Sequence, residues 1–185
     1  MKDLFEAIRA GDQIRVQELV AADPSLAIFA AAIQGDTGQL TALLTANRSL
    51  VSQLSTDGWT PLHLAAFFGK TEAARLLLNK GAQVGARSTN PMENMPLHAA
   101  AAGRHLDAAK LLIEHGAPVN ARQHGGWSPL HAAAQNGDLE LAKTLVSAGA
   151  DVNVRAENNQ TPLDLALTKG QQAMVDYLES NGAKL

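Results

Sequence analysis

Cysteine is absent from this chain of 185 residues, and aromatic side chains number only seven. Without cysteine there is no disulfide framework and no thiolate chemistry. No apolar run reaches the roughly 18 residues that a membrane-spanning helix needs. The net charge of −3 supplies no overall positive field of the kind that nucleic-acid binding requires. We therefore expect neither a membrane nor a nucleic acid as partner.

The first residues of the chain are too charged to form the apolar centre of a signal peptide. Together with the missing cysteines, this start favours a reducing compartment, so we expect a cytoplasmic protein. The sequence gives no sign of self-association, and we expect a monomer.

A short motif recurs along the chain at a nearly constant interval. The tetrapeptide Thr-Pro-Leu-His that begins at Thr60 returns, with substitutions, at Met95, Ser128 and Thr161, in steps of 35, 33 and 33 residues. A period in this range indicates a solenoid of stacked helical units. Such units contact only their neighbours and build a long concave surface. The repeat therefore favours a protein that binds other macromolecules.

The similarity between the copies extends past the tetrapeptide. An amphipathic, leucine-rich stretch follows each one and ends at a Gly-Ala pair, and residues 149–153 read Gly-Ala-Asp-Val-Asn. This pattern resembles the ankyrin repeat. The resemblance implies an all-α ankyrin-repeat solenoid of about six helix-pair units, with short β-hairpin fingers between the later units.

The units are not all alike. The glycines that end the first helix of a unit lie only 24 residues apart at Gly11 and Gly35, against 34 from Gly35 to Gly69. The shorter spacing has no room for a finger, so we expect two fingerless units over 1–51, including a polar N-terminal cap. Four well-matched units follow over 52–185, the last serving as the C-terminal cap. We predict one domain over 1–185.

Individual residues of the repeat have clear physical roles. Proline suits the first turn of a helix, and the Thr or Ser before it is a natural N-cap. Glycine at 69, 137 and 170 suits a left-handed helix end. The second copy of the tetrapeptide unit has Arg104 at this place and Gly103 one residue earlier. Either Arg104 adopts a positive φ at some cost, or the turn is rebuilt around Gly103.

Three histidines, His63, His98 and His131, suggest a metal site at first sight. They belong to successive units, and packed helices lie about 8–10 Å apart, whereas one zinc ion needs its nitrogen ligands within about 2.1 Å. The resemblance implies instead that each histidine ties its helix to its own finger and the next by hydrogen bonds. No convergent nucleophile, base or metal set is visible. We predict no metal, no cofactor and no enzymatic activity.

The few aromatic residues fall at places that line the groove in ankyrin-repeat proteins. Trp59 and Trp127 precede the tetrapeptide cap in two different units, and Phe67 and Phe68 end a first helix. Trp and other aromatic residues often anchor interfaces, although the Trp rings could simply pack on the neighbouring finger. The other groove positions that we predict to contact a partner are Asn94, Gln135, Asn136, Gln160 and Lys169.

Arginine recurs at one position of the repeat, as Arg87, Arg122 and Arg155. Stacked fingers would align these guanidinium groups in a row that could face a carboxylate-rich partner. The alternative is an ordinary solvated flank of the fingers. The finger at residues 88–94 is two residues longer than its counterparts, which suits recognition but also neutral drift.

The sequence thus predicts a non-catalytic module that binds a partner protein through its concave groove. One alternative is a regulatory or targeting subunit of a larger enzyme assembly. A second is a small-molecule binder or enzyme that uses a pocket among the fingers. A pocket of about 300–1,000 Å³ would favour this second alternative over a broad peptide groove.

Overall fold

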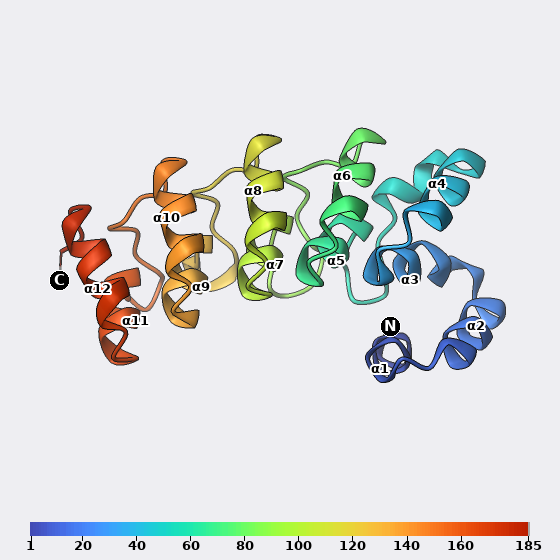
Figure 1. Ribbon diagram of the computed structural model, residues 1–185, viewed down its shortest axis with the longest axis horizontal. Helices are drawn as coiled ribbons and strands as arrows, with labels where there is room; N and C mark the ends of the chain where they lie inside the picture. The colour runs from blue at the N-terminus through green and yellow to red at the C-terminus, as the bar shows by residue number, and fades with distance from the viewer. Residues whose placement is uncertain (185) are drawn as a thin grey trace.

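The computed structural model describes residues 1–184, in which twelve α-helices follow one another in pairs (Figure 1). Short 3-10 turns join some of them: η1 (Pro24–Leu26), η2 (Arg48–Ser52) and η3 (His124–Gly126). The α-helices are α1 (Lys2–Ala10), α2 (Gln13–Ala22), α3 (Ala27–Gln34), α4 (Thr37–Ala46), α5 (Pro61–Phe67), α6 (Thr71–Asn79), α7 (Pro96–Ala102), α8 (Leu106–Glu114), α9 (Pro129–Asn136), α10 (Leu139–Ser147), α11 (Pro162–Thr168) and α12 (Gln172–Ser180).

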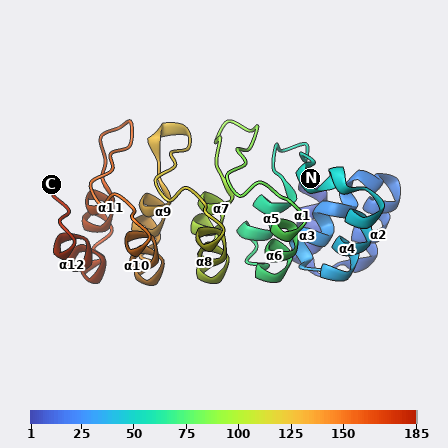
Figure 2. The ribbon, with the colours of Figure 1, turned by 90° about the horizontal axis from the view of Figure 1, so that it is seen from above.

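The helix pairs from α3 onward stack in a row with two layers (Figures 1 and 2). The inner layer holds α3, α5, α7, α9 and α11, and the outer layer holds α4, α6, α8, α10 and α12. Small side chains allow the inner helices to approach closely: Ala65, Ala66, Ala100 and Ala134 are fully buried between neighbours. Leucines such as Leu77 fill the space between the layers. The sequence prediction of an all-helical solenoid is confirmed.

Four loops, which we call fingers, project from one side of the row (Figure 2). Their bounds are residues 53–60, 86–95, 121–128 and 154–161 for fingers 1 to 4. The predicted β-hairpins are wrong, because residues 1–184 contain no strand. One backbone hydrogen bond closes each finger, from Ser55 to Trp59 or from Gln123 to Trp127 for example. A single bond cannot propagate a ladder in a loop this short.

Adjacent fingers are joined to each other by single backbone hydrogen bonds. Thr89 N donates to the carbonyl of Gly58 (3.0 Å), His124 N to that of Met92 (2.9 Å), and Glu157 N to that of Gly125 (2.9 Å). Finger 2 makes a further contact, because Asn90 Nδ2 donates to the carbonyl of Asp57 (3.1 Å). Its extra length is therefore used in part to contact finger 1.

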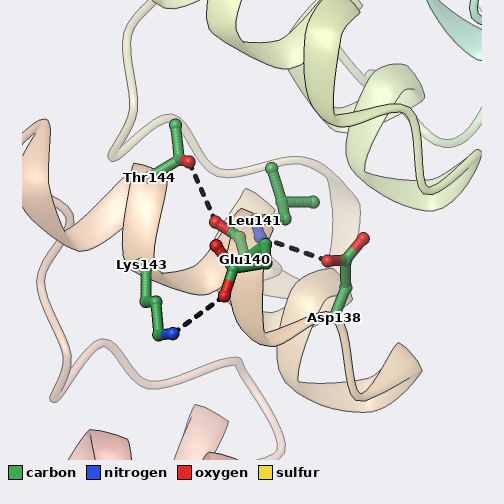
Figure 3. A network of polar contacts seen from close by, with 5 residues as sticks. All are labelled: Asp138, Glu140, Leu141, Lys143 and Thr144. Atoms are coloured by element: carbon green, nitrogen blue, oxygen red, sulfur yellow. Dashed lines mark hydrogen bonds and ion pairs between the residues drawn. The ribbon is translucent and has the colours of Figure 1, made fainter.

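An aspartate caps the second helix in three of the six helix pairs. Asp12, Asp36 and Asp138 each accept a hydrogen bond from a backbone N–H in the first turn of the following helix. Figure 3 shows the third case, in which the Asp138 carboxylate accepts from Leu141 N (3.1 Å). In the same turn Lys143 pairs with Glu140 (2.8 Å). Lys70, which precedes α6, takes this place without any side-chain cap.

Glycine ends the inner helices as predicted, with φ of +65°, +66° and +65° at Gly69, Gly137 and Gly170. In the second copy Arg104 adopts the left-handed conformation, with φ of +61°, while Gly103 remains right-handed with φ of −75°. Of the two alternatives left open by the sequence, Arg104 therefore takes the turn. No helix among residues 1–184 combines the length and apolar character that crossing a membrane would require.

Helices α1 and α2 are turned out of the row formed by the later pairs (Figure 1). The amino group of Met1 donates to Thr56 Oγ1 in finger 1 (3.5 Å). At the same corner the Phe5 ring lies 5.9 Å from the Phe68 ring at the end of α5. Helix α1 thus spans from finger 1 to the end of α5 and closes one end of the inner face.

Candidate binding surface

The histidines of the repeat join each inner helix to the next finger. His63 Nε2 donates to the carbonyl of Asn94 (3.0 Å), and His131 Nε2 donates to that of Gln160 (3.1 Å). His98 Nε2 lies within reach of two carbonyls, those of Ala121 (3.0 Å) and Trp127 (3.3 Å). These contacts confirm the structural role that the resemblance implied.

The second ring nitrogen of each histidine fixes its protonation state. Nδ1 accepts from the backbone N–H of the cap residue, as in Thr60 to His63 (3.3 Å). A ring that accepts at Nδ1 and donates at Nε2 is neutral. Burial lowers the pKa of His63 and of His98 to about 4, and it also lowers the pKa of His131.

Asp164 takes the histidine position in the last unit. Its carboxylate accepts from the backbone N–H and the hydroxyl of Thr161, both at 2.8 Å. These hydrogen bonds lower the pKa of Asp164. A short carboxylate thus caps its own helix, and its hydrogen bonds remain within its own unit.

The predicted arginine row exists, and its guanidinium groups bond to the fingers themselves. Arg87 Nη1 donates to the carbonyl of Arg122 (3.2 Å), and Arg122 Nη2 donates to that of Arg155 (2.5 Å). Each arginine also donates to a carbonyl of its own finger, Arg155 to that of Asn159 for example (3.2 Å). The row is therefore a ladder that links fingers 2, 3 and 4, with the three side chains on the exposed flank.

Trp59, Phe67 and Phe68 lie together at the N-terminal end of the inner face. The rings of Trp59 and Phe67 meet edge to face at 5.4 Å, and those of Phe67 and Phe68 do so at 5.2 Å. Phe5 of α1 extends the series on the other side of Phe68. Four of the seven aromatic side chains thus form one continuous cluster, and each of them is half-buried.

This cluster forms one wall of a pocket of about 740 Å³. The other walls come from α1, α3 and finger 1. The residues that line the pocket are Phe5, Ile8, Arg9, Ile33, Asp57, Trp59, Leu64, Phe67, Phe68 and Lys70. The volume lies in the range of small-molecule sites.

A second hollow, of about 280 Å³, lies farther along the inner face. It brings together three of the predicted residues, Trp127, Gln135 and Asn136, from finger 3 and α9. Met92 of finger 2 lines it as well and is 47% exposed. This hollow is a stretch of the groove between fingers and inner helices.

The remaining predicted residues lie apart from these two hollows. Asn94 is buried at the base of finger 2, where its carbonyl accepts from His63 and its side-chain Oδ1 has no hydrogen-bond partner. Gln160 is half-buried, and its carbonyl accepts from His131. Lys169 is exposed just after α11.

Sequence reasoning missed the contribution of α1 to the first pocket. Phe5, Ile8 and Arg9 occupy positions i, i+3 and i+4 and therefore share one side of the helix. That spacing indicated a shared helix face that could line a pocket, but the same pattern is equally typical of an ordinary N-terminal cap. Only the turn of α1 toward finger 1 places these residues beside Phe68.

The chain matches the family model described as ankyrin repeats in three copies, over residues 4–88, 85–156 and 125–185. It belongs to the ankyrin repeat family, whose members generally serve as protein–protein interaction modules and are typically not enzymes. It is 33% identical over 98 residues to the rat ankyrin repeat and SAM domain-containing protein 6, and 37% identical over 98 residues to the mouse protein of the same name. Each match covers 48% of this chain and 11% of the relative.

Proposed function

We propose that this chain is a non-catalytic module that binds a partner protein through its inner face. The supporting observation is that two hollows lie on that face and contain the aromatic residues Trp59, Phe67, Phe68 and Trp127. Half-buried aromatic side chains in a hollow give large contact area at low entropic cost and are frequent interface anchors. Gln135 and Asn136 would supply polar contacts beside Trp127.

The hydrogen bonds of the arginine ladder limit how its three side chains can bind a partner. Their guanidinium groups already donate to finger carbonyls, so a partner carboxylate would add to these bonds or compete with them. We therefore assign the ladder two roles in the proposal: it fixes the spacing of the fingers, and it gives their flank a positive charge that steers an acidic partner.

The proposal treats residues 1–185 as a single domain that acts as a cytoplasmic monomer without cofactor. The reasons are those of the sequence: one continuous repeat and no cysteine. Sedimentation at several protein concentrations tests the monomer. A mass that rises with concentration would contradict it.

A binding experiment with matched variants tests the proposed face. Wild-type protein and two variants serve as bait in extract from the native host. The inner-face variant carries Trp127→Ala and Asn136→Ala, and the outer-face control carries Arg75→Ala and Lys110→Ala, both exposed on outer helices. Each captured protein is then purified and its affinity for the three baits measured.

The inner-face variant should lose about tenfold or more in affinity, because anchor truncation commonly costs about 2 kcal/mol or more. The control should bind like the wild type. The opposite pattern, with binding lost only in the outer-face control, would place the interface on the outer helices.

A further inference from the structure

The pocket at the N-terminal end of the inner face is larger than the hollow beside Trp127. Its volume is about 740 Å³, against about 280 Å³ for the groove hollow. Its walls come from three places in the sequence: α1, α3 with α5, and finger 1. A pocket of this volume with walls from three segments suits a small ligand, whereas a bound chain segment needs a groove that continues in both directions.

The pocket lining is apolar at its centre. Ile8 of α1, Ile33 of α3 and Leu64 of α5 lie beside the aromatic cluster in the wall. The two ring pairs of Phe67, with Trp59 and with Phe68, meet edge to face and leave ring surface on the pocket side. Such a lining favours a flat ring system or an acyl chain as ligand, because the hydrophobic part of the binding free energy grows with the apolar area removed from water.

The charged residues of the lining have no charged partners in the protein. Arg9, Lys70 and Asp57 all line the pocket, and none of them takes part in an ion pair among residues 1–184. Arg9 lies in the last turn of α1, and Lys70 follows the end of α5. Asp57 belongs to finger 1, which precedes α5. The two cations thus come from the C-terminal ends of α1 and α5, and the acid comes from the loop before α5.

Lys70 is the only lysine or arginine at its position in the repeat. Asp36 and Asp138 hold the same place before α4 and α10, and their carboxylates cap those helices, whereas His105 and Gln171 before α8 and α12 provide no cap. A positive charge at a helix N-terminus is electrostatically unfavourable, and Lys70 offers α6 no cap. The stem of Lys70 packs over Gly35, as His105 does over Gly69. Packing therefore explains a long side chain at position 70 but leaves its ammonium group without a role.

We propose that this pocket binds a small amphipathic carboxylate, with its ring or acyl chain against Phe67 and Phe68 and its carboxylate between Arg9 and Lys70. Two cations against one acid favour an anionic ligand, and Asp57 of finger 1 would accept a hydrogen bond from a ligand hydroxyl or amide. This site goes beyond the proposed function. A ligand here would cover Trp59, Phe67 and Phe68 and exclude a partner protein from that end of the face.

Three naphthalene derivatives that share one ring system and carry an anionic, a neutral or a cationic substituent test the site. The probes are 2-naphthoate, 2-naphthalenemethanol and 2-naphthylmethylamine, titrated by calorimetry into the full chain. Binding is located in amide NMR spectra of the labelled protein. Because the chain has only two tryptophans, it gives two indole signals, and that of Trp127 is an internal control for that of Trp59.

The naphthoate should bind about tenfold or more tightly than the alcohol, and the amine should bind weakest, since the carboxylate gains charge-assisted hydrogen bonds. Only the Trp59 indole signal should shift. In the variant with Arg9→Gln and Lys70→Gln, affinity for the naphthoate should fall to that for the alcohol, while affinity for the alcohol stays unchanged. The control with Arg75→Gln and Lys143→Gln removes two exposed charges elsewhere and should leave both affinities unchanged.

Several results would overturn the proposal. Absence of naphthoate binding up to about 1 mM would do so, as would equal shifts of both indole signals or preference for the amine. A blocked acidic peptide with one Trp and two Glu residues is titrated in parallel. Peptide binding that shifts the Trp59 signal, with no binding of the naphthoate, would assign the pocket to a protein side chain instead.

Discussion

Gly103, the residue after α7, lies directly against the carbonyl oxygen of Phe67 at the end of α5, so closely that a Cβ on Gly103 would overlap with that oxygen. Glycine is therefore needed at position 103 for packing, although its φ of −75° is open to any residue. Arg104, the next residue, takes the left-handed conformation that the other units give to glycine. The second copy of the tetrapeptide unit thus has its glycine one residue before the turn.

Separate substitutions at these two positions should have opposite effects on the free energy of unfolding. Gly103→Ala should lower the unfolding free energy by about 1–3 kcal/mol, because the backbone must shift to relieve the overlap. Arg104→Gly should change it little or raise it by up to about 1 kcal/mol, because strain at positive φ is removed. Urea denaturation measures both, and a Gly103→Ala protein as stable as the wild type would contradict the packing role.

His98 should matter far more for stability than His124. His98→Ala leaves the carbonyl of Ala121 without its donor and that of Trp127 with only the Gln123 N–H, and it should cost about 1–3 kcal/mol. His124 is exposed, and His124→Ala should change the unfolding free energy by less than about 0.5 kcal/mol. Equal shifts of the two denaturation midpoints would show that His98 does not have this structural role.

Stability should fall on acidification below the usual histidine pKa. His63 and His98 have a pKa of about 4 in the folded chain, whereas the unfolded chain takes up protons near 6.5. Between these values the unfolded state binds more protons, so stability is complete above pH 6.5 and decreases as pH falls toward 4. Each histidine contributes at most about 1.4 kcal/mol per pH unit over this window.

Urea midpoints at about pH 7, 6 and 5 measure this dependence. The His98→Gln variant is the matched control, because it keeps a donor but loses the titrating ring, and its slope should be shallower. A slope equal to that of the wild type would show that His98 is not a source of the acid sensitivity.

The arginine ladder should stabilise the fingers independently of any partner. Arg122→Lys should lower the unfolding free energy by about 0.5–1.5 kcal/mol, since one ammonium cannot reach both Gly126 and Arg155. Arg75→Ala, which removes an exposed pair with Glu72 at 3.6 Å, should cost less than about 0.5 kcal/mol. Amide hydrogen exchange of residues 154–161 should be faster in Arg122→Lys. Unchanged exchange would mean that the guanidinium groups do not hold the fingers together.

The sequence by itself determined the repeat, the helix boundaries and the role of the tetrapeptide. These features are local or depend on the next unit along the chain: Pro61 and Thr60 start a helix wherever they occur, and His63 reaches the finger of the following unit. In a solenoid nearly every contact lies within one unit or between adjacent units, so a repeat of about 33 residues determines most of the fold. The aromatic residues that later units contribute to the two hollows, Trp59, Phe67, Phe68 and Trp127, followed from the same repeat pattern.

Only the tertiary structure decided where the protein departs from the repeat pattern. The fingers have one closing hydrogen bond each, so the expected β-hairpins do not form. The guanidinium groups of the arginine row bond to neighbouring fingers, a result that depends on the exact spacing between loops. Above all, α1 turns out of the row and brings Phe5 to within 5.9 Å of Phe68. A repeat pattern describes how equivalent units stack, and it holds no information on the angle at which a degenerate first unit packs.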